Sequence, residues 1–192
     1  MPRTYCKPTA YDLSAITELV VSTFDHAVAA DWSSEASNSF RDEVSVQNLG
    51  NAIDSAFFCE VCIVDGNLAG VVLLPNPRII ALTFVSAKYR RLGIATALIE
   101  HGIREVTAHC PDVAVVCLNA TRFAFPFYRA QGFFPISPEY EHRGAVVTRM
   151  ALWSRYYNFL RGPGASANLS VNADPPARAF FFANADGGGP VT

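Results

Sequence analysis

The segment from residue 85 to residue 99 has the residue types of an anion-binding turn. An apolar run ends there in a basic, glycine-containing stretch that leads into a helix pattern. Backbone amides in the first turn of a helix have no intrahelical acceptor, and the helix dipole places about half a positive charge at that end. The stretch from Arg91 to Ala95 would therefore bind a phosphate group well. It lacks the Gly-Lys-Ser/Thr ending of a Walker loop and the Gly-x-Gly-x-x-Gly spacing of a dinucleotide site.

A second segment whose residues could take part in a reaction runs from Ala124 to Phe133, about thirty residues after the basic turn. Pro126 suits the first turn of a short helix, and Gly132 suits the position after its end. Between them stands Tyr128, whose phenol can donate a proton and has a reference pKa of about 10. The same pattern is also compatible with an ordinary core tyrosine.

Two short motifs in these segments resemble those of a known family. The pattern Arg90-x-x-Gly93-x-Ala95, which follows a predicted strand, resembles the acetyl-coenzyme A signature of the GNAT family of N-acetyltransferases. The pattern Ala-x-Pro-Phe-Tyr-x-x-x-Gly-Phe at 124–133 resembles a later segment of the same family. Because the motifs occur in the family's order and follow a predicted meander of three strands, the resemblance extends over residues 3–153.

The first motif and its surroundings depart from the family pattern at three positions. Ala87 stands where proline is usual, Arg91 where glycine is frequent, and Ala95 where glycine is the commonest choice. None of these changes removes a backbone amide. Arg91 adds a guanidinium that could contact a phosphate or stay solvated.

The resemblance implies an α+β fold, the GNAT acyl-coenzyme A N-acyltransferase fold. Its central sheet is mixed, mostly antiparallel and flanked by helices, and its strands four and five splay apart. In that family the pantetheine of the co-substrate pairs with the fourth strand like an additional strand, and here that edge would be Leu82–Val85. The implied co-substrate is acetyl-coenzyme A, without a metal. The implied contacts are Phe84, Val85, Arg90, Arg91, Leu92, Gly93, Ile94, Ala95, Thr96 and Asn119. Asn119 could equally cap the end of its strand.

Acetyl transfer to nitrogen requires a neutral amine, a stabilised oxyanion and protonation of the leaving thiolate. The resemblance assigns the proton donor to Tyr128, and the amide of Val85 is a candidate for polarising the thioester carbonyl. Many family members carry a glutamate on the fourth strand, but Ile79–Leu82 contains no carboxylate. A chain of water molecules could serve instead as the base. The candidate side chains for the general base are Glu60, His26, Glu35 and His142.

The expected function is acetyl transfer from acetyl-coenzyme A to a primary amine by direct attack, with another acyl-coenzyme A as an alternative donor. Residues 1–78 carry four Lys or Arg against ten Asp or Glu, whereas residues 79–161 carry ten against five. The basic half suits a polyanionic co-substrate. The acidic half favours a cationic acceptor such as a polyamine, an aminoglycoside-like amine, a lysine or a peptide N-terminus. Both halves could equally carry solvated surface charges.

The alternatives to this function differ in class. The net charge of −2 argues against nucleic acid as a partner, because nucleic acid favours a basic protein. A GNAT-like sensor or structural module that binds acetyl-coenzyme A without turnover is the alternative to an enzyme. The absence of a carboxylate from the fourth strand favours that alternative, and Tyr128 opposes it.

Hydrophobic periodicity predicts the elements that position these residues. Strands are expected at 4–7, 57–64, 68–74, 79–85, 113–118 and 145–153, with a tight turn at 65–67. Helices are expected at 12–24, after Ser33, at 44–53, at 93–106 and within 124–132. Asp12 is expected to cap the first helix. The strand at 79–85 is apolar over most of its length and is expected to be buried on both faces.

The five cysteines suit reduced thiols better than a disulfide framework. The Cys59-x-x-Cys62 pair resembles half of a zinc site, but no second ligand pair follows at useful spacing. Both cysteines lie in a predicted strand, where their side chains would point to opposite faces. Core packing is therefore the favoured interpretation.

Length and composition predict one domain with an extension. We expect an N-acetyltransferase domain at residues 1–161 and a Gly-, Ala- and Pro-rich extension at residues 162–192. The apolar run Ala179–Ala183 could dock on the domain or on a second subunit, which would make a homodimer, and an adventitious tail is the alternative. The sequence contains no pattern of a signal peptide or membrane span, so we expect a cytoplasmic protein with no membrane partner.

Overall fold

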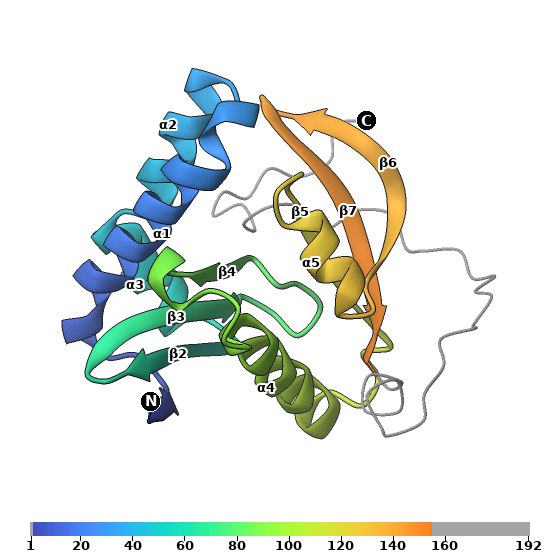
Figure 1. Cartoon of the computed structure of the whole chain (residues 1–192). Coiled ribbons are helices and arrows are strands. Elements are labelled where there is room, and N and C mark those ends of the chain that lie inside the picture. Colours follow the sequence, from blue (N-terminus) through green and yellow to red (C-terminus); the bar gives the residue numbers. More distant parts are fainter. Residues whose placement is uncertain (1, 155–192) are drawn as a thin grey trace, which may run out of the picture.

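The computed structural model describes residues 2–154 (Figure 1). Its strands are β1 (Arg3–Cys6), β2 (Phe58–Val64), β3 (Asn67–Leu74), β4 (Leu82–Val85), β5 (Val115–Ala120), β6 (Phe134–His142) and β7 (Ala145–Trp153). Its α-helices are α1 (Leu13–Ala27), α2 (Ser34–Glu43), α3 (Val46–Asp54), α4 (Ile94–His109) and α5 (Phe125–Ala130). Short 3-10 turns occupy Ala10–Asp12, Ala29–Asp31 and Ala87–Tyr89. Strands and helices do not alternate regularly, so the expected α+β class is confirmed.

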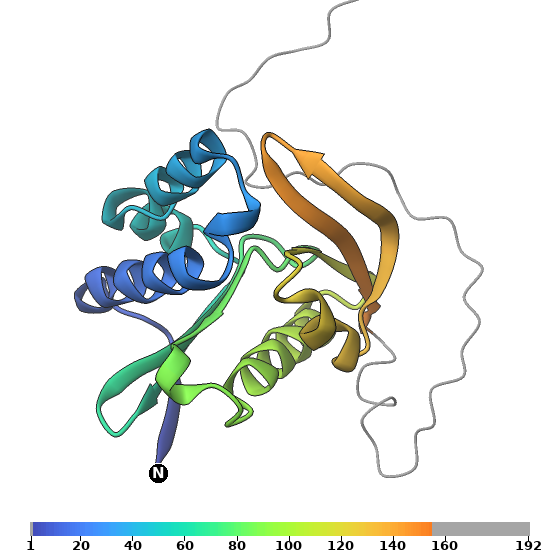
Figure 2. The ribbon, with the colours of Figure 1, turned by 45° about the horizontal axis from the view of Figure 1, so that its top comes forward.

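The strands form two sheets that part between β4 and β5 (Figures 1 and 2). Antiparallel β1-β2-β3-β4 makes one sheet, and antiparallel β5-β7-β6 makes the other. A parallel bridge between Ile79 and Cys117 joins them. There the amide of Ile80 donates to the Cys117 carbonyl at 3.0 Å, and the amide of Cys117 donates to the Arg78 carbonyl at 2.8 Å. The expected splay of the fourth and fifth strands is confirmed.

Helices cover both faces of the four-stranded sheet (Figure 2). Strand side chains alternate between the faces, so each face contributes its own layer of the core. Ile16 and Val20 of α1 and Leu49 of α3 pack on the layer that contains Val71. The apolar side of α4 packs on the opposite layer, which continues to α5 and the second sheet. The parting of the sheets therefore has α1 and α2 on one side and α4 and α5 on the other.

The fourth and sixth strands differ from the sequence expectation. Ladder pairing in β4 begins only at Leu82, because the chain at 79–81 crosses between the two sheets. From Thr83 onward β4 is half-buried rather than buried on both faces, since its outer edge borders the parting. The first strand of the C-terminal hairpin, β6, is not expected from sequence because Pro135 and Pro138 interrupt its pattern. Its ladder is irregular between Pro135 and Glu139.

Two smaller expectations are settled by the described residues. Asp12 does not cap α1, because its carboxylate accepts from the Thr9 amide and hydroxyl at 2.7 and 2.8 Å. Cys59 and Cys62 are both buried and belong to core layers on opposite faces of the sheet, which confirms that they pack in the core. No described helix is long and apolar enough to cross a membrane. The run Ala179–Ala183 and the domain boundary at residue 161 lie outside the described residues.

Candidate active site

The turn between β4 and α4 presents free backbone amides at the start of a sixteen-residue helix. Gly93 precedes the helix with φ of 76°, and Arg91 also occupies the left-handed region with φ of 64°. The first helical amide that finds a backbone acceptor is that of Ala97, which donates to the Gly93 carbonyl at 3.0 Å. The amides at 94–96 come before it and have no intrahelical acceptor. This is the geometry of an anion cradle.

Two residues outside the motif hold this cradle in place. Arg3, at the start of β1, donates from Nη1 to the Leu92 carbonyl at 2.5 Å. Gly70 of β3 leaves space for the first residue of α4. A Cβ on Gly70 would lie 3.1 Å from Ile94 Cγ2 and 3.1 Å from the Phe84 carbonyl oxygen. Sequence reasoning missed both residues, because their roles depend on which strands neighbour the turn.

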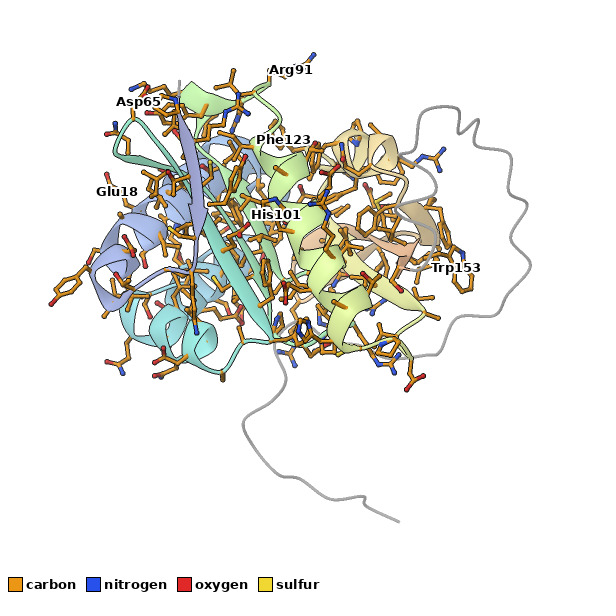
Figure 3. The ribbon with its side chains drawn as sticks, turned by 90° about the horizontal axis from the view of Figure 1, so that it is seen from below. Glu18, Asp65, Arg91, His101, Phe123 and Trp153 are labelled. Carbon is orange, nitrogen blue, oxygen red and sulfur yellow. The ribbon has the colours of Figure 1, made fainter. Side chains whose placement is uncertain are left out.

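The two arginines of the cradle differ in their surroundings. Arg91 is exposed, and its side chain points into solvent at the edge of the molecule (Figure 3). Arg90 is half-buried, and its guanidinium carbon lies 5.1 Å from the centre of the Phe123 ring. Phe123 belongs to the connection between β5 and α5 and is 53% exposed. A cation–π contact therefore links the cradle to the second half of the site.

Tyr128 lies on α5 and is buried beside the parting of the sheets. Its ring packs against Phe127 and Phe133, with centroid distances of 5.2 and 5.6 Å. Burial raises the pKa of the phenol above its ordinary value, and the nearby hydroxyl of Thr83 on β4 opposes the rise only in part. Thr83 Oγ1 is itself buried and has no well-formed hydrogen bond to any described group. Tyr128 is thus a neutral phenol that faces the fourth strand.

The remaining predicted contacts occupy β4 and β5. Val85 lies opposite Gly70 in the β3–β4 ladder. Phe84 points to the other face of the sheet, where its ring lies 6.2 Å from that of Phe40. Asn119 of β5 accepts a hydrogen bond from the Tyr140 hydroxyl at 3.3 Å. That bond gives Asn119 a structural role and leaves its predicted contact with the co-substrate untested.

The candidate bases do not gather at the parting of the sheets. Glu60 is two strands away from β4's outer edge, because it lies opposite Val72, which lies opposite Thr83. Its Oε2 is 2.6 Å from Nδ1 of His101 on α4. The other candidates lie at the periphery of the described structure: His26 and Glu35 are exposed, and His142 is half-buried near the tip of the β6–β7 hairpin. Across residues 2–154, no three His, Cys, Asp or Glu side chains are grouped to hold a metal ion.

A set of polar contacts joins the two sides of the parting at the end opposite the Ile79–Cys117 bridge. We call this set the clasp; it comprises Asp31, Ser33, Arg122, Glu139 and Gly144. The amide of Ser33 donates to the Gly144 carbonyl at 2.9 Å. Arg122 donates to both oxygens of Glu139 at 2.6 and 2.8 Å and lies 3.6 Å from Asp31. Figure 1 shows the hairpin tip beside the start of α2.

This arrangement is the one implied above for acyl-coenzyme A-dependent acyltransferases: a divided sheet, an anion cradle at one end of the division and a buried phenol inside it. Residues 28–154 match the model of the acetyltransferase (GNAT) domain. The chain therefore belongs to the GNAT family of acetyltransferases. A search of curated proteins finds no match.

Solved structures with the same fold include several GNAT proteins. A GCN5-related N-acetyltransferase from Rhodopseudomonas palustris is 15% identical, with a TM-score of 0.69 over 80% of this chain and 96% of that one. The PaiA N-acetyltransferase from Thermoplasma acidophilum, solved with coenzyme A, is 16% identical, with a TM-score of 0.64 over 78% and 98%. The ribosomal-protein-S18-alanine N-acetyltransferase from Escherichia coli is 18% identical, with a TM-score of 0.56 over 79% and 94%. At these identities the likeness shows the fold.

Proposed function

We propose that this protein transfers the acetyl group of acetyl-coenzyme A to a primary amine by direct attack, with Tyr128 as the general acid. One observation carries the proposal. The Tyr128 phenol is buried against β4 at the parting of the sheets, and the anion cradle lies at the end of the same strand. A thioester held along that edge would have its phosphates at the cradle and its sulfur near the phenol.

The co-substrate contacts follow from this placement. Amides of the cradle, from Arg91 to Thr96, would hold the pyrophosphate, because an anion satisfies donors that lack an acceptor. The outer edge of β4 beyond the Ile79–Cys117 bridge pairs with no described strand. It would take up the amides of pantetheine in the manner of an added strand. The Val85 amide is the donor that we propose for the thioester carbonyl.

The reaction then needs one attack and one proton transfer to sulfur. The amine lone pair attacks the carbonyl carbon, and the π electrons move to oxygen. The oxyanion lone pair then re-forms the C=O bond as the C–S bond breaks, and sulfur leaves with the bonding pair and takes the proton of Tyr128 Oη. Solvent receives a proton from the new amide nitrogen and returns one to the phenolate. Burial favours protonation of a thiol at this parting, as it does for Cys117 on β5, whose pKa it raises.

The test is the substitution Tyr128→Phe. It should lower kcat for acetyl transfer by about a hundredfold, within the range of general acid catalysis. The dissociation constant of acetyl-coenzyme A should change less than threefold, because the ring stays in place. Initial rates of thiol release and calorimetric titration measure the two quantities. Tyr89→Phe, which removes another buried tyrosine hydroxyl, is the matched control.

Two outcomes would contradict the proposal in different ways. Equal losses of kcat and of co-substrate affinity would make Tyr128 a packing residue. Tight binding of coenzyme A without turnover of any amine would favour the sensor or structural module described above.

A further inference from the structure

Four aromatic side chains form a continuous row from the clasp to the fourth strand, and we call them the aromatic row: Phe24, Trp32, Phe40 and Phe84. Phe24 lies behind the others and is 1% exposed. Its ring centre is 5.1 Å from that of Trp32 and 4.4 Å from that of Phe40. Phe40 continues the row to Phe84, at 6.2 Å.

The row runs from the clasp to the fourth strand along the side of the parting that carries α1 and α2. Trp32 is the neighbour of Ser33, whose amide is part of the clasp. Phe84 is the neighbour of Thr83, the residue that faces the Tyr128 phenol. Trp32, Phe40 and Phe84 are each half-buried rather than fully enclosed. An acceptor that reaches the thioester from the side of α1 and α2 would lie along these rings.

Trp32 carries an unsatisfied polar group in this row. Its Nε1–H is buried and donates to no described acceptor. A buried donor without an acceptor is a rare feature of native proteins and calls for a partner. After a small turn of the indole, the π face of an aromatic ring on a bound molecule would accept from this N–H.

The charges at the clasp argue against a polycationic acceptor. Asp31 and Glu139 lie on the two sides of this end of the parting, but each is engaged by Arg122. The Arg122 side chain lowers the pKa of Glu139, so this carboxylate is ionised and paired. The clasp also joins the two walls at that end through the Ser33 amide and the Gly144 carbonyl, which leaves less room there for an extended peptide.

We infer that the acceptor is a small primary amine attached to a flat aromatic group, which stacks on the aromatic row. Aromatic rings prefer offset or edge-to-face contacts with other rings, and the row offers both. The amine would then point along Phe84 toward the thioester. This inference rests on the proposed acetyltransferase function and narrows its acceptor from a cationic amine to an arylalkylamine.

The test compares acceptors that differ only in the group attached to the amine. We expect kcat/KM with acetyl-coenzyme A to be at least fivefold higher for 2-phenylethylamine than for 2-cyclohexylethylamine, which has a similar shape without a flat π face. Spermidine should be the poorest of the three. Trp32→Leu should lower kcat/KM for 2-phenylethylamine about fivefold and that for 2-cyclohexylethylamine less than twofold, which shows that the folded site is intact.

The possible outcomes distinguish a failure of the inferred acceptor class from a failure of the proposed acetyltransferase function. Acetylation of spermidine in preference to both ring amines would overturn the inference and leave the acetyltransferase function standing. An equal loss for all amines in Trp32→Leu would also overturn it. Failure of the wild-type protein both to bind coenzyme A and to acetylate any amine would overturn the proposed function itself.

Discussion

Burial of Tyr128 determines the protonation state of its phenol. Its phenol is held away from water by Phe127 and Phe133, so the ionised form is disfavoured and the pKa is raised. A group with a raised pKa binds its proton more tightly in the folded than in the unfolded state. Its contribution to the free energy of unfolding is complete below the unfolded pKa, near 10, and is lost as pH rises above that value.

We therefore expect the proton donor to remain neutral throughout the neutral and mildly alkaline range. For the reaction, kcat should show no decline between pH 6 and pH 9.5 that depends on Tyr128. The measurement is the pH profile of kcat for wild type and Tyr128→Phe with one saturating amine. An alkaline decline with a midpoint below pH 10 that disappears in Tyr128→Phe would contradict this expectation.

The clasp joins two elements, α2 and the β6–β7 hairpin, that share no ladder of hydrogen bonds. Gly144 sits at the hairpin tip with φ of 80°, and a Cβ there would collide with Ser33. Gly66, at the tip of the β2–β3 hairpin, has φ of 77° and open space around it. Both glycines have a left-handed backbone that a residue with a Cβ would adopt only with strain. Only Gly144 also has neighbouring atoms where that Cβ would lie.

Gly144→Ala should therefore lower the free energy of unfolding more than Gly66→Ala does. The left-handed backbone alone should cost about 1–2 kcal/mol in both variants, and Gly144→Ala should add the displacement of Ser33. Urea unfolding followed by circular dichroism measures both. Equal losses would mean that the hairpin tip and α2 are not held together in solution.

The elements also show what the sequence could predict. Periodicity located most helices and strands, and the paired motifs around Gly93 and Tyr128 identified the divided sheet, because both depend on neighbours close in sequence. The partners of the site depend on contacts across the fold. Arg3 binds Leu92, and Arg122 binds Asp31 and Glu139, over separations that no local pattern encodes. β6 could not be predicted from the sequence, because its two prolines interrupt the pattern of a strand.

For the molecule as a whole, the parting of the sheets gives the co-substrate a structural role. A ligand that pairs with β4 would bridge two sheets whose backbones otherwise meet at the Ile79–Cys117 bridge. It would add stability in proportion to RT ln(1 + [L]/Kd), about 2.7 kcal/mol at a ligand concentration of 100 Kd. The gain should be concentrated at the parting.

Hydrogen exchange should locate that gain. Saturating acetyl-coenzyme A should slow exchange at Leu82–Val85 and at 91–96, with little change in β1 and β2. Peptide-level mass spectrometry with and without the ligand measures this, and coenzyme A serves as the control that lacks the acetyl group. Uniform protection of the whole domain would contradict binding along the fourth strand.

The Ile79–Cys117 bridge has a further consequence for the acyl group that the site can admit. Within the described residues no ladder runs across the parting, and the backbones of the two sheets meet at this bridge. At the other end, the clasp ties the start of α2 to the hairpin, and its Arg122 side chain is 55% exposed. We therefore expect contacts at the hairpin tip, far along the chain from the residues proposed to hold the thioester, to influence how long an acyl chain the site accepts.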